Sequence, residues 1–91
     1  MNNFLLRPGE EKDCLRVWTL IKELAIYEKA EEQMVLTVEQ LKIDGFGKAP
    51  KYGLYVVENE SGEVFGMALY YEKYSTWTGS CIYLEDLIHK L

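Results

Sequence analysis

The chain has 91 residues, which leaves room for one domain with a modest core, and its 48% hydrophobic content excludes a disordered chain. The net charge of −5 makes nucleic acid an unexpected partner and favours cationic small molecules or basic peptides, unless the charge serves solubility alone. No run of residues is long and apolar enough to span a bilayer, so we expect no membrane partner.

The first segment predicts a strand followed by a long helix. Residues 4–7 form a short apolar run that Pro8 and Gly9 end, as expected for a strand and a turn. Acidic residues from Glu10 onward crowd a helix start, where the backbone dipole favours negative charge. A helix is expected over residues 10–28 because apolar residues recur there at helical spacing, namely Val17, Leu20, Ile21, Leu24 and Tyr27.

A second, shorter helix is expected over residues 38–44. Thr37 and Gln40 have the spacing of a capping box, in which the Thr37 hydroxyl accepts from the Gln40 backbone N–H and the Gln40 side chain reaches back. Gly45 then suits the left-handed residue that commonly ends a helix.

The second half of the chain predicts three strands. Residues 54–57 have strand-like composition, residues 59–62 suit a hairpin turn, and residues 64–71 form the returning strand. Residues 72–78 are interpreted as a polar and aromatic connection, and residues 81–88 as the last strand. The fold class is therefore α+β with the order β-α-α-β-β-β, in which an antiparallel meander packs against the first helix.

The two cysteines, Cys14 and Cys81, lie within apolar patterns and form no close-spaced metal motif, so no metal is expected. Both are interpreted as reduced core residues of a cytoplasmic protein. The start of the chain lacks the basic and apolar regions of a signal peptide, in agreement with a cytoplasmic location.

The last strand contains two neighbouring acids, Glu85 and Asp86. Regular alternation places Asp86 on an otherwise apolar face with Ile82, Leu84 and Ile88, and Glu85 on the opposite face. A carboxylate on an apolar face must be paired, hydrogen-bonded or near solvent, and a bulge at this point would turn it elsewhere. The pair either binds and deprotonates a cationic amine or forms a polar strand end facing water.

Four other side chains are candidates with two interpretations each. Glu28 begins an acidic cluster that either attracts cations or is a solvated loop, and Tyr27 either contacts a substrate or packs in the helix stripe. Trp77, between two threonines, either stacks on a cation or covers the sheet edge. His89 is the only histidine and either acts as a general base or is solvated near the chain end.

Several segments of the sequence form a set that is specific only when taken together. They are residues 4–8, Leu20-Ile21-Lys22-Glu23-Leu24-Ala25 with Tyr27-Glu28, Glu31-Glu32-Gln33, Leu36-Thr37, Asp44-Gly45-Phe46-Gly47, Tyr70-Tyr71, Trp77-Thr78-Gly79 and Tyr83-Leu84-Glu85-Asp86-Leu87. Together they resemble the spermidine/spermine and thialysine acetyltransferase branch of the GNAT superfamily, and the resemblance covers the chain as far as Ile88.

The resemblance implies the N-terminal half of a GNAT fold, with acetyl-CoA lying in a split between central strands and acetyl passing directly to a primary amine such as a polyamine or a lysine-like compound. It implies that Glu85 and Asp86 face this cationic amine and that Tyr27 and Glu28 lie near it. Trp77 is a further substrate-binding candidate because its ring can stack on a cation. It also implies that backbone groups of Leu87, Ile88 and His89 pair with the pantetheine arm of acetyl-CoA.

The family pattern continues from this strand into a glycine-rich loop that opens a helix and holds the pyrophosphate, whereas this chain ends with His89-Lys90-Leu91. We therefore expect residues 1–91 to form a single truncated domain that is inactive alone. The alternatives are a non-catalytic remnant, or an interaction module that forms a homodimer through the exposed edge of the last strand, or an unrelated small ligand-binding domain.

Overall fold

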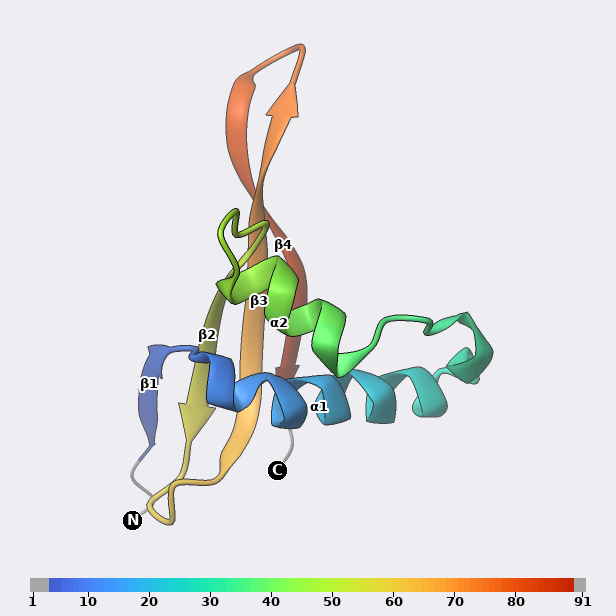
Figure 1. Ribbon diagram of the computed structural model, residues 1–91, viewed down its shortest axis with the longest axis vertical. Coiled ribbons are helices and arrows are strands. Elements are labelled where there is room, and N and C mark those ends of the chain that lie inside the picture. The colour runs from blue at the N-terminus through green and yellow to red at the C-terminus, as the bar shows by residue number, and fades with distance from the viewer. Residues whose placement is uncertain (1–3, 90–91) are drawn as a thin grey trace.

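The computed structural model describes residues 4–89 and shows a four-stranded antiparallel sheet with two α-helices across one face (Figure 1). This confirms the predicted element order and the meander. Within the described residues, no helix is both long enough and apolar enough to cross a membrane. The elements are β1 (Leu5–Pro8), a 3₁₀ turn (Glu11–Asp13), α1 (Cys14–Tyr27), a second 3₁₀ turn (Glu31–Gln33), α2 (Val38–Phe46), β2 (Gly53–Glu58), β3 (Val64–Ser75) and β4 (Gly79–His89).

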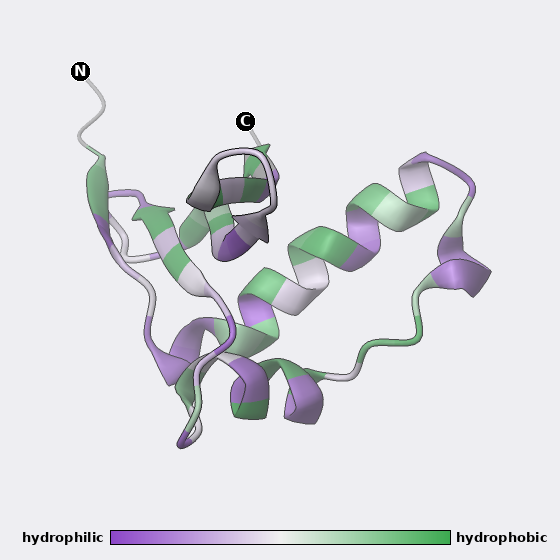
Figure 2. Cartoon of the chain, turned by 90° about the horizontal axis from the view of Figure 1, so that it is seen from above, coloured by the Kyte–Doolittle hydropathy of each residue, from purple (hydrophilic) through white to green (hydrophobic). Residues whose placement is uncertain are grey.

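The core lies between α1 and the sheet. Val17 and Leu20 of α1 are fully buried against Val56 of β2 and Met67 of β3, because the apolar stripe of the helix faces the sheet. Figure 2 shows hydrophobic and hydrophilic stretches alternating along α1, as this one-sided burial requires. The other buried apolar residues of this cluster are Cys14, Leu41, Leu54, Val64 and Leu69.

An ion cluster joins β1, the start of α1 and β2. The Arg7 guanidinium donates to both carboxylate oxygens of Asp13, at 2.9 and 3.0 Å, and to Glu58 Oε2 at 3.2 Å. Asp13 also accepts from the Glu10 backbone N–H at 2.8 Å and is only 5% exposed. Burial raises the pKa of Asp13, but the hydrogen bonds from Arg7 and Glu10 outweigh it and leave the pKa below its ordinary value. The sequence predicted the acids at this helix start but not their basic partner.

The second helix begins at Val38 as predicted but ends two residues later than expected, and its capping differs in part. Thr37 Oγ1 accepts from the Gln40 backbone N–H as predicted, but the Gln40 side chain donates to Asp44 at 2.8 Å, so only half of the capping box forms. Gly45 lies inside α2, which continues to Phe46. The absence of a Cβ at Gly45 lets the ring of Tyr52 approach to a distance that any side chain would block.

The β3–β4 hairpin corrects the expected connection over residues 72–78. Strand β3 continues to Ser75. The Ser75 Oγ accepts hydrogen bonds from the backbone N–H groups of Trp77 and Thr78 and closes a tight turn. Tyrosines have high strand propensity, and the rings of Tyr71 and Tyr83 lie 5.4 Å apart across the pair. The two strands therefore form a ribbon that projects beyond the rest of the sheet (Figure 1).

The ribbon also explains why one prediction for the cysteines is wrong. Both thiols are free, and Cys14 is buried as expected. Cys81 is exposed because it lies on the ribbon, opposite Lys73 and beyond the part of the sheet that the helices cover.

The predicted hairpin turn after β2 is confirmed: Asn59 Oδ1 accepts from two backbone N–H groups, and Gly62 has a φ of +82°.

The face of the sheet opposite the helices is apolar and open. Strand alternation places Leu6, Tyr55, Leu84 and Ile82 there, because their neighbours along each strand, such as Val56, face the helices. These four side chains are 41–68% exposed. Within residues 4–89 no element covers this open face, which we define by these four residues.

Candidate functional site

A β-bulge at Glu85 determines where the two acids of β4 point. Asp86 pairs with Leu69 and Leu84 pairs with Tyr70, so Glu85 is one residue more than the partner strand has. Regular alternation therefore fails and the bulge considered from the sequence is confirmed: Asp86 and Ile88 lie on the face covered by α1, whereas Leu84 and Ile82 lie on the open face.

Asp86 is a partly buried carboxylate in an acidic environment. Burial raises the pKa of Asp86, and the negative charges of Glu85 and Glu28 raise it further. Within the part of the chain that the structure describes, no side chain or backbone N–H donates a hydrogen bond to it. Glu28, at the end of α1, thus lies near enough to Asp86 for its charge to raise the pKa of that carboxyl. Such a carboxylate becomes more stable when it binds a proton or a cation.

The acidic residues beyond α1 contribute less negative charge than their number suggests. The acidic cluster consists of Glu28, Glu31 and Glu32. Glu31 lies 3.3 Å from the ammonium of Lys22, so one of these three carboxylates is already paired. Tyr27 is 85% exposed and does not pack in the helix stripe as one interpretation held. Its exposed ring next to Glu28 leaves the substrate interpretation open.

Trp77 lies far from these acids. It is 94% exposed in the turn between β3 and β4, so it does not cover a sheet edge. Eight residues along the chain lie between it and Asp86, and the seven residues of β4 before Asp86 alone span roughly 23 Å. Contact between Trp77 and an amine at Asp86 stays a prediction.

The outer edge of β4 is the region that the family resemblance assigns to acetyl-CoA. Since the strand order is β1-β2-β3-β4, β4 has a partner on one side only within residues 4–89. Leu87, Ile88 and His89 pair with β3, and Ile88 packs against the core. On the side away from β3, backbone groups of this segment have no partner strand within residues 4–89. The side chains of Leu87 and His89 lie outside the described part of the structure, as does any role of the imidazole as a base.

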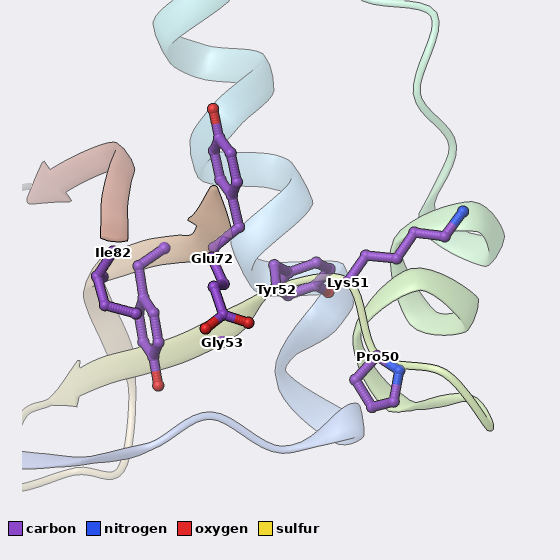
Figure 3. A pocket seen from close by; sticks show the side chains of 8 residues that line it. Pro50, Lys51, Tyr52, Gly53, Glu72 and Ile82 are labelled. Carbon is purple, nitrogen blue, oxygen red and sulfur yellow. The ribbon is translucent and has the colours of Figure 1, made fainter. Parts of the chain in front are cut away.

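A hollow that the sequence did not predict lies between the start of β2 and the ribbon. Figure 3 shows Glu72 and Ile82 on one side of it and Lys51 and Pro50 on the other. Residues 72–78 have the polar and aromatic composition of a connection, so local sequence does not indicate that Glu72 lies beside Ile82 across a strand pair. Among the described residues, no group of His, Cys, Asp and Glu side chains has the arrangement of a metal site.

Comparison with known proteins gives relatives over nearly the whole chain. Thialysine N-epsilon-acetyltransferase of Bos taurus is 44% identical over 94% of this chain and 55% of its own length, and that of Mus musculus is 39% identical over 90% and 52%. Spermidine/spermine N(1)-acetyltransferase-like protein 1 of Homo sapiens is 40% identical over 94% of this chain but 13% of its own. No protein-family model matches. The chain spans about half the length of the thialysine relatives.

Solved structures agree in fold. A possible acetyltransferase from Clostridium difficile 630 superimposes with a TM-score of 0.65 at 17% identity, over 94% of this chain and 57% of that one. An aminoglycoside acetyltransferase from a soil metagenomic sample has a TM-score of 0.64 at 15% identity, over 94% and 55%. At these identities the likeness is one of architecture, and it corresponds to about half of each solved chain.

Proposed function

We propose, given that this chain is a GNAT acetyltransferase relative of the thialysine and spermidine/spermine-like branch, that it forms the amine-binding half of an N-acetyltransferase. The reaction would transfer acetyl from acetyl-CoA to a primary amine of a polyamine or a lysine-like compound. The chain corresponds to about half of its relatives, so we propose that residues 1–91 alone do not turn over. The free, exposed Cys81 supports a reducing compartment such as the cytoplasm.

One observation carries this proposal: Asp86 is partly buried beside Glu85 and Glu28 and has no hydrogen-bond donor among the described residues. A primary amine is mostly protonated near pH 7, so three carboxylates attract it in its cationic form. The amine attacks only when neutral, and a carboxylate with a raised pKa is better suited than an ordinary one to accept its proton through a water molecule. Burial, together with the charges of Glu85 and Glu28, raises the pKa of Asp86.

The cofactor would supply the reactive thioester. The unpaired outer edge of β4 supports a location next to Asp86, because backbone groups of residues 87–89 follow it directly in the same strand. Binding of both reactants along one strand would bring the amine to the acetyl group, which contributes to rate by proximity alone.

A chimera tests this function. The 91 residues are joined to the part of the Bos taurus relative that lies beyond the aligned region, and acetylation of thialysine, lysine and spermidine is followed by mass spectrometry. We expect acetyl-CoA-dependent acetylation of at least one of these amines, and none by the 91-residue chain alone. A chimera that folds, as judged by circular dichroism, and binds acetyl-CoA but acetylates no primary amine would contradict the proposal.

A second candidate function is a dimerising module, which the unpaired edge of β4 and the open face favour. Two copies would pair through residues 79–84, because the bulge at Glu85 and the neighbouring acids hinder pairing further along the strand. Light scattering at tens of micromolar is then expected to show a dimer. Leu84→Lys should shift it to monomer, whereas Ile43→Lys, on the exposed side of α2, should not. A monomeric parent chain would exclude this function.

A further inference from the structure

The hollow beside the ribbon has a volume of about 690 Å³ and is separate from the acids of β4. Glu72 pairs with Ile82, and both side chains lie on the open face of the sheet, whereas Leu69 and Asp86 lie on the face covered by α1. The lining residues come from the loop before β2, from β3 and from β4 (Figure 3). They are Pro50, Lys51, Tyr52, Gly53, Tyr70, Tyr71, Glu72 and Ile82.

Two walls of the hollow are the side chains of Tyr70 and Tyr52, which packing and hydrogen bonding hold in place. The ring of Tyr70 lies against the backbone of Gly53, where a Cβ would be 2.2 Å from a ring atom, and it stacks on Tyr55 with centroids 6.0 Å apart. The Tyr52 hydroxyl donates to the Leu41 carbonyl at 2.7 Å. These walls are therefore formed before any ligand arrives.

The free charge in the hollow is negative. Glu72 has no hydrogen-bond or ion-pair partner among residues 4–89. Lys73, the next residue, turns to the other side and lies 5.0 Å over the ring of Tyr83. Lys51 at the rim has Asp44 at 3.8 Å. Together with the net charge of −5, this arrangement favours a cationic group next to Glu72.

The backbone next to Glu72 is also unpaired. The pairing of β2 with β3 ends at Gly53 and Tyr70, whereas β3 continues to Ser75. Residues 71–75 thus have a partner strand on the β4 side only, within the described chain. A two-stranded ribbon is marginally stable alone, and a third strand added to this edge would satisfy its backbone groups.

We propose that this hollow and the free edge of β3 bind an extended peptide with a lysine or arginine side chain. The peptide backbone pairs with residues 71–75, and its basic side chain enters the hollow beside Glu72 and the ring of Tyr70, which lie on the same side of the sheet. The binding needs neither acetyl-CoA nor Asp86, so it stands or fails separately from the proposed acetyltransferase function.

Calorimetric titration with the pentapeptide Thr-Val-Lys-Val-Thr, blocked at both ends, tests this site on the 91-residue chain. We expect saturable binding that weakens as salt concentration rises. Glu72→Gln should weaken binding about threefold to tenfold, since it removes the charge and keeps the shape. Glu60→Gln, in the exposed hairpin turn after β2 and outside the lining of the hollow, is the matched control and should bind like the parent.

Two further probes separate the parts of the proposal. A peptide with N-methyl groups on alternate amides should bind at least about tenfold more weakly, because it cannot pair with a strand edge. The small cation butylammonium should bind more weakly than the peptide. Equal binding of either probe, unchanged binding of Glu72→Gln, or no saturation at millimolar peptide would overturn the inference.

Discussion

Replacing Arg7 with methionine is expected to lower the free energy of unfolding by about 3–5 kcal/mol. Asp13 is only 5% exposed, and the variant leaves its carboxylate buried without the guanidinium that donates to both of its oxygens. A domain of this size has roughly 5–15 kcal/mol of total stability, so the loss is a large fraction of it. Urea unfolding followed by circular dichroism gives the value.

The pH dependence of stability provides the internal check. The pKa of Asp13 is below its ordinary value in the folded state, so its stabilising contribution is present above about pH 4 and is lost as the pH falls further. The difference between the parent and Arg7→Met should therefore shrink in acid. Lys22→Met, which breaks the more exposed pair with Glu31, is the control and should cost at most about 1 kcal/mol. Equal losses for both variants would refute the central role of Arg7.

In the chimera, Asp86→Asn is expected to lower kcat/KM for a cationic amine by about 100-fold or more, the usual contribution of a general base. Glu85→Gln should have a smaller effect, because this exposed carboxylate attracts the amine without holding its proton. Steady-state kinetics with spermidine and lysine give both values. Glu39→Gln, on an exposed position of α2, removes the same charge and should leave the kinetics unchanged.

A pH profile distinguishes a base from a merely structural residue. The charges of Glu85 and Glu28 contribute to the raised pKa of Asp86, so removing either charge should lower that pKa. The acid limb of kcat/KM should then move to lower pH in Glu28→Gln and in Glu85→Gln. Full activity of Asp86→Asn, or an acid limb that neither Glu→Gln variant moves, would remove Asp86 from the chemistry.

Local patterns in the sequence predicted what depends on local physics. The apolar spacing of Val17 and Leu20 gave the buried side of α1, Thr37 gave the start of α2, and Asn59 with Gly62 gave the hairpin turn. Each of these features involves residues within a few positions of one another. The resemblance then placed the segments in a known order, which the sheet confirms.

Features that depend on distant partners could not be predicted in this way. The bulge at Glu85 is a mismatch between two strands, so no alternation within β4 alone reveals it. The pairing of Arg7 with Glu58 joins residues far apart in the chain. Likewise, Gly45 has the local signature of a helix end. A glycine is needed there because the ring of Tyr52, from another segment, occupies the space of a Cβ.

The bulge divides β4 into two halves of opposite parity. Before it, odd-numbered residues such as Tyr83 share the side of the helices, and after it, even-numbered residues such as Asp86 do so. The extra residue is therefore what lets Ile82 and Leu84 lie on the open face while Asp86 lies on the side of α1, although all three stand at even positions in the sequence. A single deletion at position 85 would remove the bulge and leave both halves facing as they do now, because Leu84 would then be followed directly by Asp86 opposite their present partners Tyr70 and Leu69.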